Sequence, residues 1–365
     1  MPEQYTDIGQ IDKNLHIEET IDKDDIVFHD VRKADVDLYG LYRPREVYPF
    51  LRMPLEDAEK VSERVFVMAK RTAGARVRFK TDSPYIAIRM TKPARKSFMA
   101  HMTHIGCAGF DCYAYEDGKY KFIKSFIPAV KMLPGYESLI ELGGKKEREL
   151  VINFPLYDRV DDLWLGIQEG CTLTPGTPYE VKKPVLFYGS SITEGGCASR
   201  PGNCYTAMVC RWLDCDHVNL GFSGNAKGEK EMAEYIAKQE MSVFVMDYDY
   251  NSDTENLQRT HWNMYDIIRK AQPELPIIMA SKCDQRYHPE KQEEVLYRRG
   301  LIMENYQRAL DAGDKHLQFL DGQTAYPPYG GDDCTVDGAH PNDLGFFAMA
   351  NAFYPYIKRA LEENY

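Results

Sequence analysis

The hydrophobic pattern of this chain changes at a cluster of breaker residues, Thr174-Pro175-Gly176-Thr177-Pro178. Before the cluster, short runs such as residues 75–81 alternate basic and apolar side chains with the period of two typical of a strand. After the cluster, strand-length apolar runs alternate with longer segments of helical period. Alternating strands and helices form a parallel sheet covered on both faces. The sequence therefore predicts an all-β sandwich, jelly-roll-like, followed by an α/β domain with a doubly wound parallel sheet.

A length of 365 residues favours two domains over one. We predict an N-terminal arm over residues 1–35, a β-sandwich domain over residues 36–180 and an α/β domain over residues 181–365. The expected sandwich strands cover residues 75–81, 85–90, 109–115, 150–155 and 163–167. In the α/β domain we expect strands at 185–188, 217–220, 242–247, 277–280 and 317–321. Its helices are expected at 205–213, 230–239, 261–271 and about 291–311, with a final helix after Asn342.

The net charge of −11 argues against nucleic acid and anionic membrane surfaces as partners, because both bind basic surfaces. No stretch approaches the length of an apolar membrane span, and the acidic start lacks the apolar core of a signal peptide. We therefore expect a cytoplasmic protein, unless an export signal has been removed. The nine cysteines have no repeating spacing, so we expect buried free thiols rather than a disulfide framework.

Two distant fragments carry the groups of a nucleophilic site. Gly189-Ser190-Ser191-Ile192-Thr193-Glu194-Gly195 follows the strand at 185–188, and Asp337-Gly338-Ala339-His340-Pro341 precedes the last helix. Alone, the first is compatible with a helix cap and the second with a surface pair. Together they supply a serine nucleophile, Ser191, a base, His340, and a carboxylate to orient it, Asp337. Thr193 stands where the α/β-hydrolase elbow requires glycine, which excludes that motif.

These fragments resemble the first and last blocks of the SGNH (GDSL) hydrolase superfamily. Ser191 aligns with the nucleophile, and Ser190 replaces the usual aspartate, which should remove one local anchor of the turn. Asn219-Leu220-Gly221-Phe222-Ser223-Gly224 is similar to the second block, and Asp247-Tyr248-Asp249-Tyr250-Asn251 stands in place of the third. The region before residue 183 is similar to the β-sandwich domain of two-domain carbohydrate esterases, especially bacterial acetyl esterases.

The resemblance implies a serine esterase with a Ser-His-Asp triad of Ser191, His340 and Asp337. It assigns the oxyanion hole to the N–H groups of Ser191 and Gly224 and to the side-chain amide of Asn251. The expected substrate is a small-molecule or oligosaccharide ester, and an acetyl group on a carbohydrate or polyol is the expected target. The reaction requires no metal or organic cofactor. Because these residues all follow residue 183, we expect the preceding region to influence substrate choice rather than the chemical step.

Other side chains admit two interpretations. Arg200, Asn203, Tyr205 and Asp249 are candidates for substrate binding, although a hydrogen-bonded loop with Tyr205 starting a helix explains the first three equally well. Asp247 and Asp249 form a carboxylate pair such as glycosidases use, but we expect them to support Asn251 at a strand end.

Further side chains are candidates for other roles. His101-x-x-His104 offers two metal ligands, but we expect strand there, where positions three apart face opposite ways. Cys197 is close enough to Ser191 in sequence to line the site, with no chemical role assigned. Tyr113, Tyr115 and His104 are candidates to extend a cleft at the domain junction. A scaffold that only covers apolar surface of the hydrolase domain is an equally good interpretation of this region.

Two alternative functions remain open. The same triad serves thioesterases and lysophospholipases, which would act on different acyl groups. A non-catalytic glycan-binding protein that kept the fold is the alternative outside enzymes, and the intact Ser191, Asp337 and His340 count against it. The sequence leaves the oligomeric state open.

Overall fold

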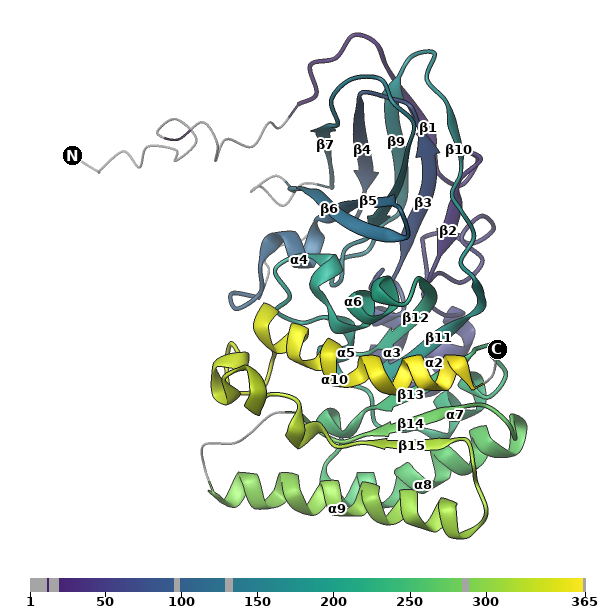
Figure 1. Cartoon of the computed structure of the whole chain (residues 1–365), viewed down its shortest axis with the longest axis vertical. Helices are drawn as coiled ribbons and strands as arrows, with labels where there is room; N and C mark the ends of the chain where they lie inside the picture. The colour runs from purple at the N-terminus through teal and green to yellow at the C-terminus, as the bar shows by residue number, and fades with distance from the viewer. Residues whose placement is uncertain (1–11, 13–19, 95–98, 129–133, 284–288, 364–365) are drawn as a thin grey trace, which may run out of the picture.

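The computed structural model describes residues 12, 20–94, 99–128, 134–283 and 289–363. Two antiparallel sheets form the upper part of the molecule and a parallel sheet with helices forms the lower part (Figure 1). The first sheet has the order β1-β9-β4-β7, with β1 Ile26–Asp30, β9 Asp162–Gln168, β4 Tyr85–Thr91 and β7 Gly135–Glu141. The second has the order β10-β3-β8-β5-β6, with β10 Leu173–Pro175, β3 Arg76–Thr81, β8 Arg148–Asn153, β5 Phe110–Glu116 and β6 Lys119–Phe126, and β2 Asp37–Tyr39 pairs with β3.

The two antiparallel sheets pack face to face, which confirms the predicted sandwich. Their shared core contains Val77 and Phe79 of β3, Ile86 and Ile88 of β4, and Leu165 of β9. Each pair of residues is two positions apart, so that both side chains leave the same face of the strand. β1 lies inside the segment expected as an N-terminal arm, and it pairs with β9 along all five of its residues.

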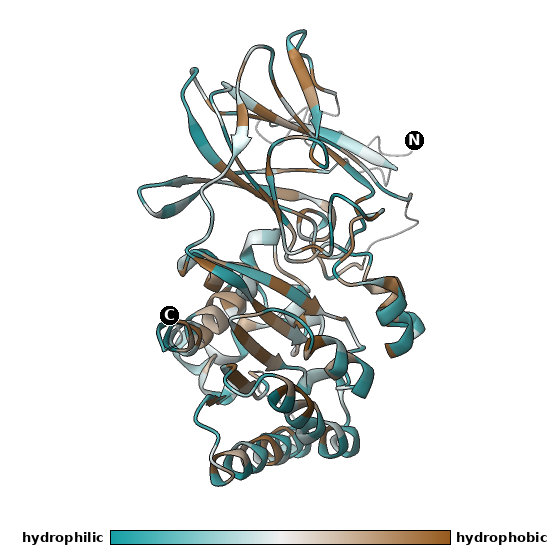
Figure 2. Ribbon diagram, turned by 90° about the vertical axis from the view of Figure 1, so that its right-hand side faces the viewer, coloured by the Kyte–Doolittle hydropathy of each residue, from teal (hydrophilic) through white to brown (hydrophobic). Residues whose placement is uncertain are grey.

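The third sheet is parallel and confirms the predicted α/β fold. Its order is β12-β11-β13-β14-β15, with β12 Cys215–Gly221, β11 Val181–Gly189, β13 Val243–Asp247, β14 Ile277–Ala280 and β15 Leu317–Leu320. This order is the one found in flavodoxin-like doubly wound sheets, whose ligands bind at the carboxyl ends of the strands. Figure 2 shows the brown of hydrophobic residues over much of this sheet, with hydrophilic teal segments in places.

Helices cover both faces of the parallel sheet. Val185 and Phe187 of β11 point to a core shared with α6 Tyr205–Trp212 and α10 Asp343–Glu362. Leu186 and Tyr188 point the opposite way, to a second core. The helices of that second face are α7 Lys230–Ile236, α8 Thr254–Ala271 and α9 Pro289–Asp311. The alternation along β11 explains why this strand is apolar without interruption from residue 185 to 188.

Three short helices precede the parallel sheet in sequence, and the sequence analysis did not predict them. They are α2 Leu55–Val61, α3 Glu63–Met68 and α4 His104–Ala108. Ala58 of α2 and Val65 of α3 are buried in the core of the parallel sheet, beside α7. Helices of five to seven residues are unstable alone, so tertiary packing rather than local sequence stabilises them.

The two parts of the molecule meet in a polar junction. Arg76 and Arg78 lie on the face of β3 predicted to be basic, and that face turns toward the parallel sheet rather than to solvent. Arg76 pairs with Asp216, and Arg78 lies 3.2 Å from Asp214. Tyr115 donates a hydrogen bond of 2.8 Å to Asp214 as well.

The contacts at this junction correct the prediction of a cleft lined by Tyr113 and Tyr115. Tyr113 is only 3 % exposed, and its hydroxyl accepts a hydrogen bond from Arg200. Tyr113 and Tyr115 therefore fasten the two parts together instead of lining an open groove. His104 begins α4, where burial lowers the pKa of its imidazole.

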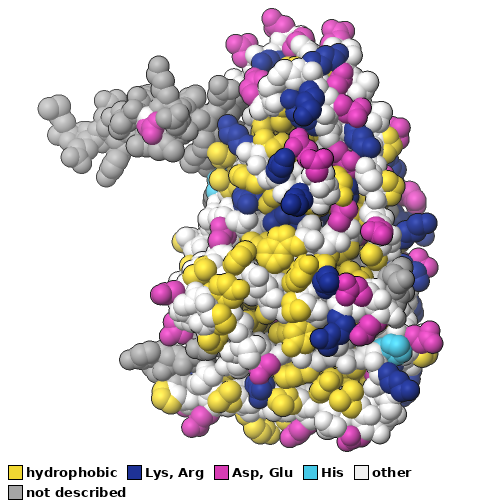
Figure 3. All heavy atoms as spheres, viewed as in Figure 1, with side chains coloured by type: hydrophobic (Ala, Val, Ile, Leu, Met, Phe, Trp, Pro, Cys, Tyr) yellow, Lys and Arg dark blue, Asp and Glu magenta, His cyan; other side chains and the backbone are white. Residues whose placement is uncertain are grey.

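The outer surface carries charges of both signs. Figure 3 shows acidic and basic side chains interspersed over the face in view. Within the described part of the chain, no helix has the length and apolar character that crossing a membrane requires.

Candidate active site

Ser191 lies at the carboxyl end of the central strand β11. The strand ends at Gly189, and α5 Ser191–Glu194 begins two residues later. A side chain at Gly189 would clash, because its Cβ would lie 2.0 Å from Thr193 Oγ1 and 2.5 Å from the carbonyl of Asp247. Ser190 caps α5 by accepting a hydrogen bond of 3.1 Å from the N–H of Ile192. The expected loss of an anchor at Ser190 is therefore wrong, since the hydroxyl performs the capping.

The structure brings Ser191, His340 and Asp337 together. Ser191 Oγ lies 2.9 Å from His340 Nε2, and His340 Nδ1 lies 2.8 Å from Asp337 Oδ2. The N–H of His340 also donates to Asp337 Oδ1 at 2.8 Å. Burial alone would raise the pKa of Asp337, but the hydrogen bonds from His340 and its charge outweigh burial and hold that pKa below its usual value. The arrangement can pass a proton from the serine to the imidazole while an ionised carboxylate orients the ring.

The oxyanion candidates flank Ser191 on the same edge of the sheet. Gly224 follows β12, on one side of β11, and has a φ of +71°, a conformation that favours glycine. Asn251 ends the short helix η3 Asp249–Asn251, directly after β13 on the other side. The side-chain Oδ1 of Asn251 is buried and has no hydrogen-bond partner among the described residues.

The acidic pair before Asn251 is structural. Asp247 is fully buried and accepts hydrogen bonds from Tyr205 at 2.8 Å and from Thr193 at 3.1 Å. Burial raises the pKa of Asp247 to about 7. Asp249 is 1 % exposed and forms a 2.8 Å ion pair with Arg298. Both carboxylates are engaged by protein groups, and Asp247 supports the serine turn rather than Asn251.

These contacts correct the substrate-binding predictions for Tyr205 and Asp249, because both side chains are buried and engaged within the protein. Arg200 pairs with Asp111 at 2.8 Å, across the junction. Asn203 donates hydrogen bonds to Asp343 at 2.8 Å and to Ser199 at 3.2 Å. The structural interpretation, a hydrogen-bonded loop followed by a helix starting at Tyr205, describes this segment.

A buried ion-pair network, which no sequence motif indicated, holds the serine turn from the side of the β-rich region. Glu194, the last residue of α5, lies 3.1 Å from Arg71 and 3.4 Å from Arg52. The Arg52 and Glu194 side chains are fully buried, and burial lowers the pKa of Arg52 to about 10, a value at which it remains charged at neutral pH.

Glu194 also joins the serine turn to the loop that carries Gly224, because it accepts a 3.0 Å hydrogen bond from the N–H of Ser223. Tyr157, also from the β-rich region, donates to the carbonyl of Ser191 at 3.0 Å. Residues before position 183 therefore contact the serine turn directly, and their influence on substrate choice rather than on the chemical step stays a prediction.

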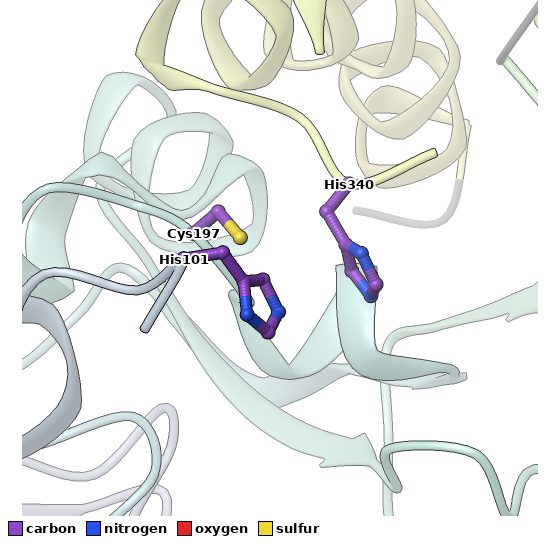
Figure 4. Close-up of side chains that lie close together, drawn as sticks. All are labelled: His101, Cys197 and His340. Atoms are coloured by element: carbon purple, nitrogen blue, oxygen red, sulfur yellow. The ribbon is translucent and has the colours of Figure 1, made fainter. Parts of the chain in front are cut away.

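A second histidine lies beside the triad. The ring centroids of His101 and His340 are 5.7 Å apart, and Cys197 lies next to both (Figure 4). His101 is exposed, whereas His104 belongs to α4, a helix where the sequence predicted strand. The nearest candidate co-ligands of His101 are thus Cys197 and His340.

The fold and this geometry define a serine ester hydrolase of the SGNH type. Residues 182–358 match the GDSL-like lipase/acylhydrolase family, and residues 26–173 match the family described as the N-terminus of SGNH-hydrolase-type esterases. The two matches together confirm the resemblance to two-domain SGNH (GDSL) hydrolases that the sequence predicted.

Solved structures share this fold. A protein from Bacteroides ovatus described as a GDSL-like lipase has 28% identity and a TM-score of 0.84, covering 92% of this chain and 98% of its own. The salicylyl-acyltransferase SsfX3 of a tetracycline biosynthetic pathway has 18% identity and a TM-score of 0.74, with 93% and 98% covered. The acetyl xylan esterase Est2A of Butyrivibrio proteoclasticus has 12% identity and a TM-score of 0.56, with 92% and 99% covered. No curated protein matches the chain.

Proposed function

We propose that this protein removes short acyl groups, acetyl above all, from a carbohydrate or similar polyol, with Ser191, His340 and Asp337 as its catalytic triad. The observation that carries the proposal is the chain of two contacts, Ser191 Oγ to His340 Nε2 at 2.9 Å and His340 Nδ1 to Asp337 Oδ2 at 2.8 Å. The acetyl and carbohydrate parts are supported by the shared two-domain fold of an acetyl xylan esterase.

In the first half-reaction, Ser191 Oγ attacks the carbonyl carbon of the ester while His340 Nε2 takes the serine proton. The carbonyl oxygen becomes an oxyanion, which the N–H groups of Ser191 and Gly224 and the amide of Asn251 stabilise. The bond to the leaving alkoxide then breaks, and His340 returns the proton to form the free alcohol. In the second half-reaction, water attacks the acyl-enzyme and the same proton transfers release the carboxylic acid.

The experiment that tests this function compares acyl groups and carriers on the purified full chain. Hydrolysis should be fastest for p-nitrophenyl acetate and should fall along the butyrate, octanoate and palmitate series, and acetylated xylo-oligosaccharides should release acetate. A preference for long acyl chains or for acyl thioesters would favour the lysophospholipase or thioesterase alternative. A fluorophosphonate probe that fails to label Ser191 would favour a non-catalytic glycan-binding protein.

Acyl transfer is a second candidate, and the salicylyl-acyltransferase that shares this fold is the observation that favours it. In transfer, an acceptor alcohol replaces water in the second half-reaction. Adding glycerol or xylose to the acetate-release assay separates the two functions. A hydrolase yields acetate regardless of the added alcohol, whereas a transferase diverts the acyl group to a new ester that mass spectrometry detects.

A further inference from the structure

Three side chains from separate parts of the chain converge at the mouth of the triad. His101 precedes α4, Cys197 follows α5, and His340 precedes α10 (Figure 4). One donor atom from each, an imidazole nitrogen or the thiol sulfur, lies within 4.8 Å of the other two. Cys197 is a free thiol held at a φ of +73°, an uncommon conformation for a residue other than glycine. The chain thus places a sulfur and two imidazoles around one point.

This donor set suits a borderline-soft divalent cation. Zinc binds imidazole nitrogen at about 2.0–2.1 Å and thiolate sulfur at about 2.3 Å in tetrahedral geometry. Tetrahedral ligands of those lengths are roughly 3.5 Å from one another, so the donors need to close in by about 1 Å. His101 is exposed and can make that adjustment by rotating its side chain. Magnesium and calcium prefer oxygen ligands and do not fit this set.

The hydrogen bond between His340 and Asp337 also suits a histidine that binds a metal. His340 Nδ1 is engaged by the Asp337 carboxylate at 2.8 Å, which leaves Nε2 to face Ser191. A carboxylate on one ring nitrogen and a metal on the other is the arrangement that orients histidine ligands in zinc sites.

We propose that His101, Cys197 and His340 form an inhibitory site for a borderline-soft divalent cation such as Zn²⁺, which competes with Ser191 for His340 Nε2. The metal occupies the lone pair that would take the serine proton, and water completes its coordination. Inhibition rests on the proposed esterase function, whereas the metal site itself does not. His101 comes from the β-rich region, so this region contributes a ligand that regulates the hydrolase half.

Two measurements on the full chain test the site. Zn²⁺ binding is measured by competition with a chromogenic chelator, using wild type and Ser191→Ala, which separates binding from activity. Zn²⁺ inhibition of p-nitrophenyl acetate hydrolysis is measured as a fraction of the metal-free rate of each variant. His101→Ala and Cys197→Ser each remove one ligand, while His29→Ala and Cys171→Ser are matched controls that remove a histidine and a thiol outside the cluster.

We expect one Zn²⁺ per chain, bound by Ser191→Ala at least as tightly as by wild type, because the variant lacks the hydroxyl that competes for His340 Nε2. Each ligand variant should weaken both binding and inhibition by about tenfold or more, since even outer partners of zinc ligands contribute 10- to 100-fold. The two controls and a challenge with Mg²⁺ or Ca²⁺ should change nothing. Zinc binding that is unaffected by both ligand variants would overturn the site. Binding without inhibition of an active enzyme would overturn its inhibitory role, and absence of esterase activity with intact zinc binding would count against the proposed function alone.

Discussion

The two halves of the proposed catalytic site differ in how the protein holds them. Ser191 is 6 % exposed and stands on a turn packed against β11, β12 and the β-rich region. Asp337 and His340 stand on a loop, and their side chains are 37% and 25% exposed. Buried long-range contacts fix the serine, with Arg52 and Arg71 reaching Glu194 from more than a hundred residues away.

The histidine half is held by contacts within a few residues. The N–H groups of Ala339 and His340 both donate to Asp337, and Gly338 donates to Thr335. The difference teaches that Ser191, the proposed nucleophile, depends on the whole fold, whereas His340 and Asp337, the proposed base and its carboxylate, form a local unit. Distant substitutions should therefore disturb the serine half and leave the histidine half intact.

Replacing Ser191 or His340 should have the largest effect on kcat, and the loss should be the same for both halves. Ser191→Ala and His340→Ala should each lower kcat by roughly 10⁴-fold or more, because each abolishes the same proton transfer. The double variant should lose little more than either single one. Steady-state hydrolysis of p-nitrophenyl acetate measures this, with circular dichroism as the control for folding. Wild-type turnover by Ser191→Ala would contradict its assignment as the nucleophile.

Breaking the buried ion pair between Arg52 and Glu194 should show the difference in stability between the two halves most clearly. Arg52→Met removes one arginine partner of Glu194 and the donor to the buried carbonyls of Gly221 and Met68, and it should lower the free energy of unfolding by about 3–5 kcal/mol. Thr335→Ala, which removes the hydroxyl that accepts from Gly338 on the exposed loop, should cost about 1 kcal/mol or less. Urea unfolding measures both. Equal losses in the two variants would show that the serine half is not the more dependent on distant contacts.

Replacing Asn251 tests whether the segment after β13 contributes an oxyanion donor to the serine half. Asn251→Ala should lower kcat by about 10²- to 10³-fold with little change in KM, because an oxyanion donor acts chiefly in the transition state. Steady-state kinetics on p-nitrophenyl acetate separate the two constants. If kcat stays near the wild-type value, the oxyanion must be stabilised by backbone groups such as the Gly224 N–H.

The buried carboxyl of Asp247 should make the stability of the serine half depend on pH. Burial raises the pKa of Asp247 from 3.8 to about 7 in the folded protein, so the folded state binds more protons than the unfolded chain between those values. The contribution of this group to stability is complete below pH 3.8 and is lost as pH rises toward 7. Asp247→Asn should remove that decline, as urea unfolding at several pH values would show. The matched control, Asp117→Asn in an exposed hairpin turn, should keep the wild-type slope.

Much of the fold could be predicted because its patterns are local. The periods of two and of 3.6 placed the sandwich strands and the alternating strands and helices of the parallel sheet. The final helix begins where expected, since Asn342 caps it by accepting from the N–H of Gly345. Helices α2, α3 and α4 were missed because they are too short for a periodic signal and depend on the surfaces they pack against.

By itself, the sequence determined which residues could carry the chemistry. Serine, histidine and aspartate in two short motifs have few alternatives as a nucleophile, a base and its partner, and strand order in a parallel sheet brings the motif ends to one edge. Tertiary structure alone decided what surrounds them. The burial of Tyr205 and Asp249, the reach of Arg52 to Glu194 and the approach of His101 to His340 depend on how two sheets dock. Such contacts join residues with no regular spacing in the sequence. They form only when the folded chain brings distant segments together, so no local pattern predicts them.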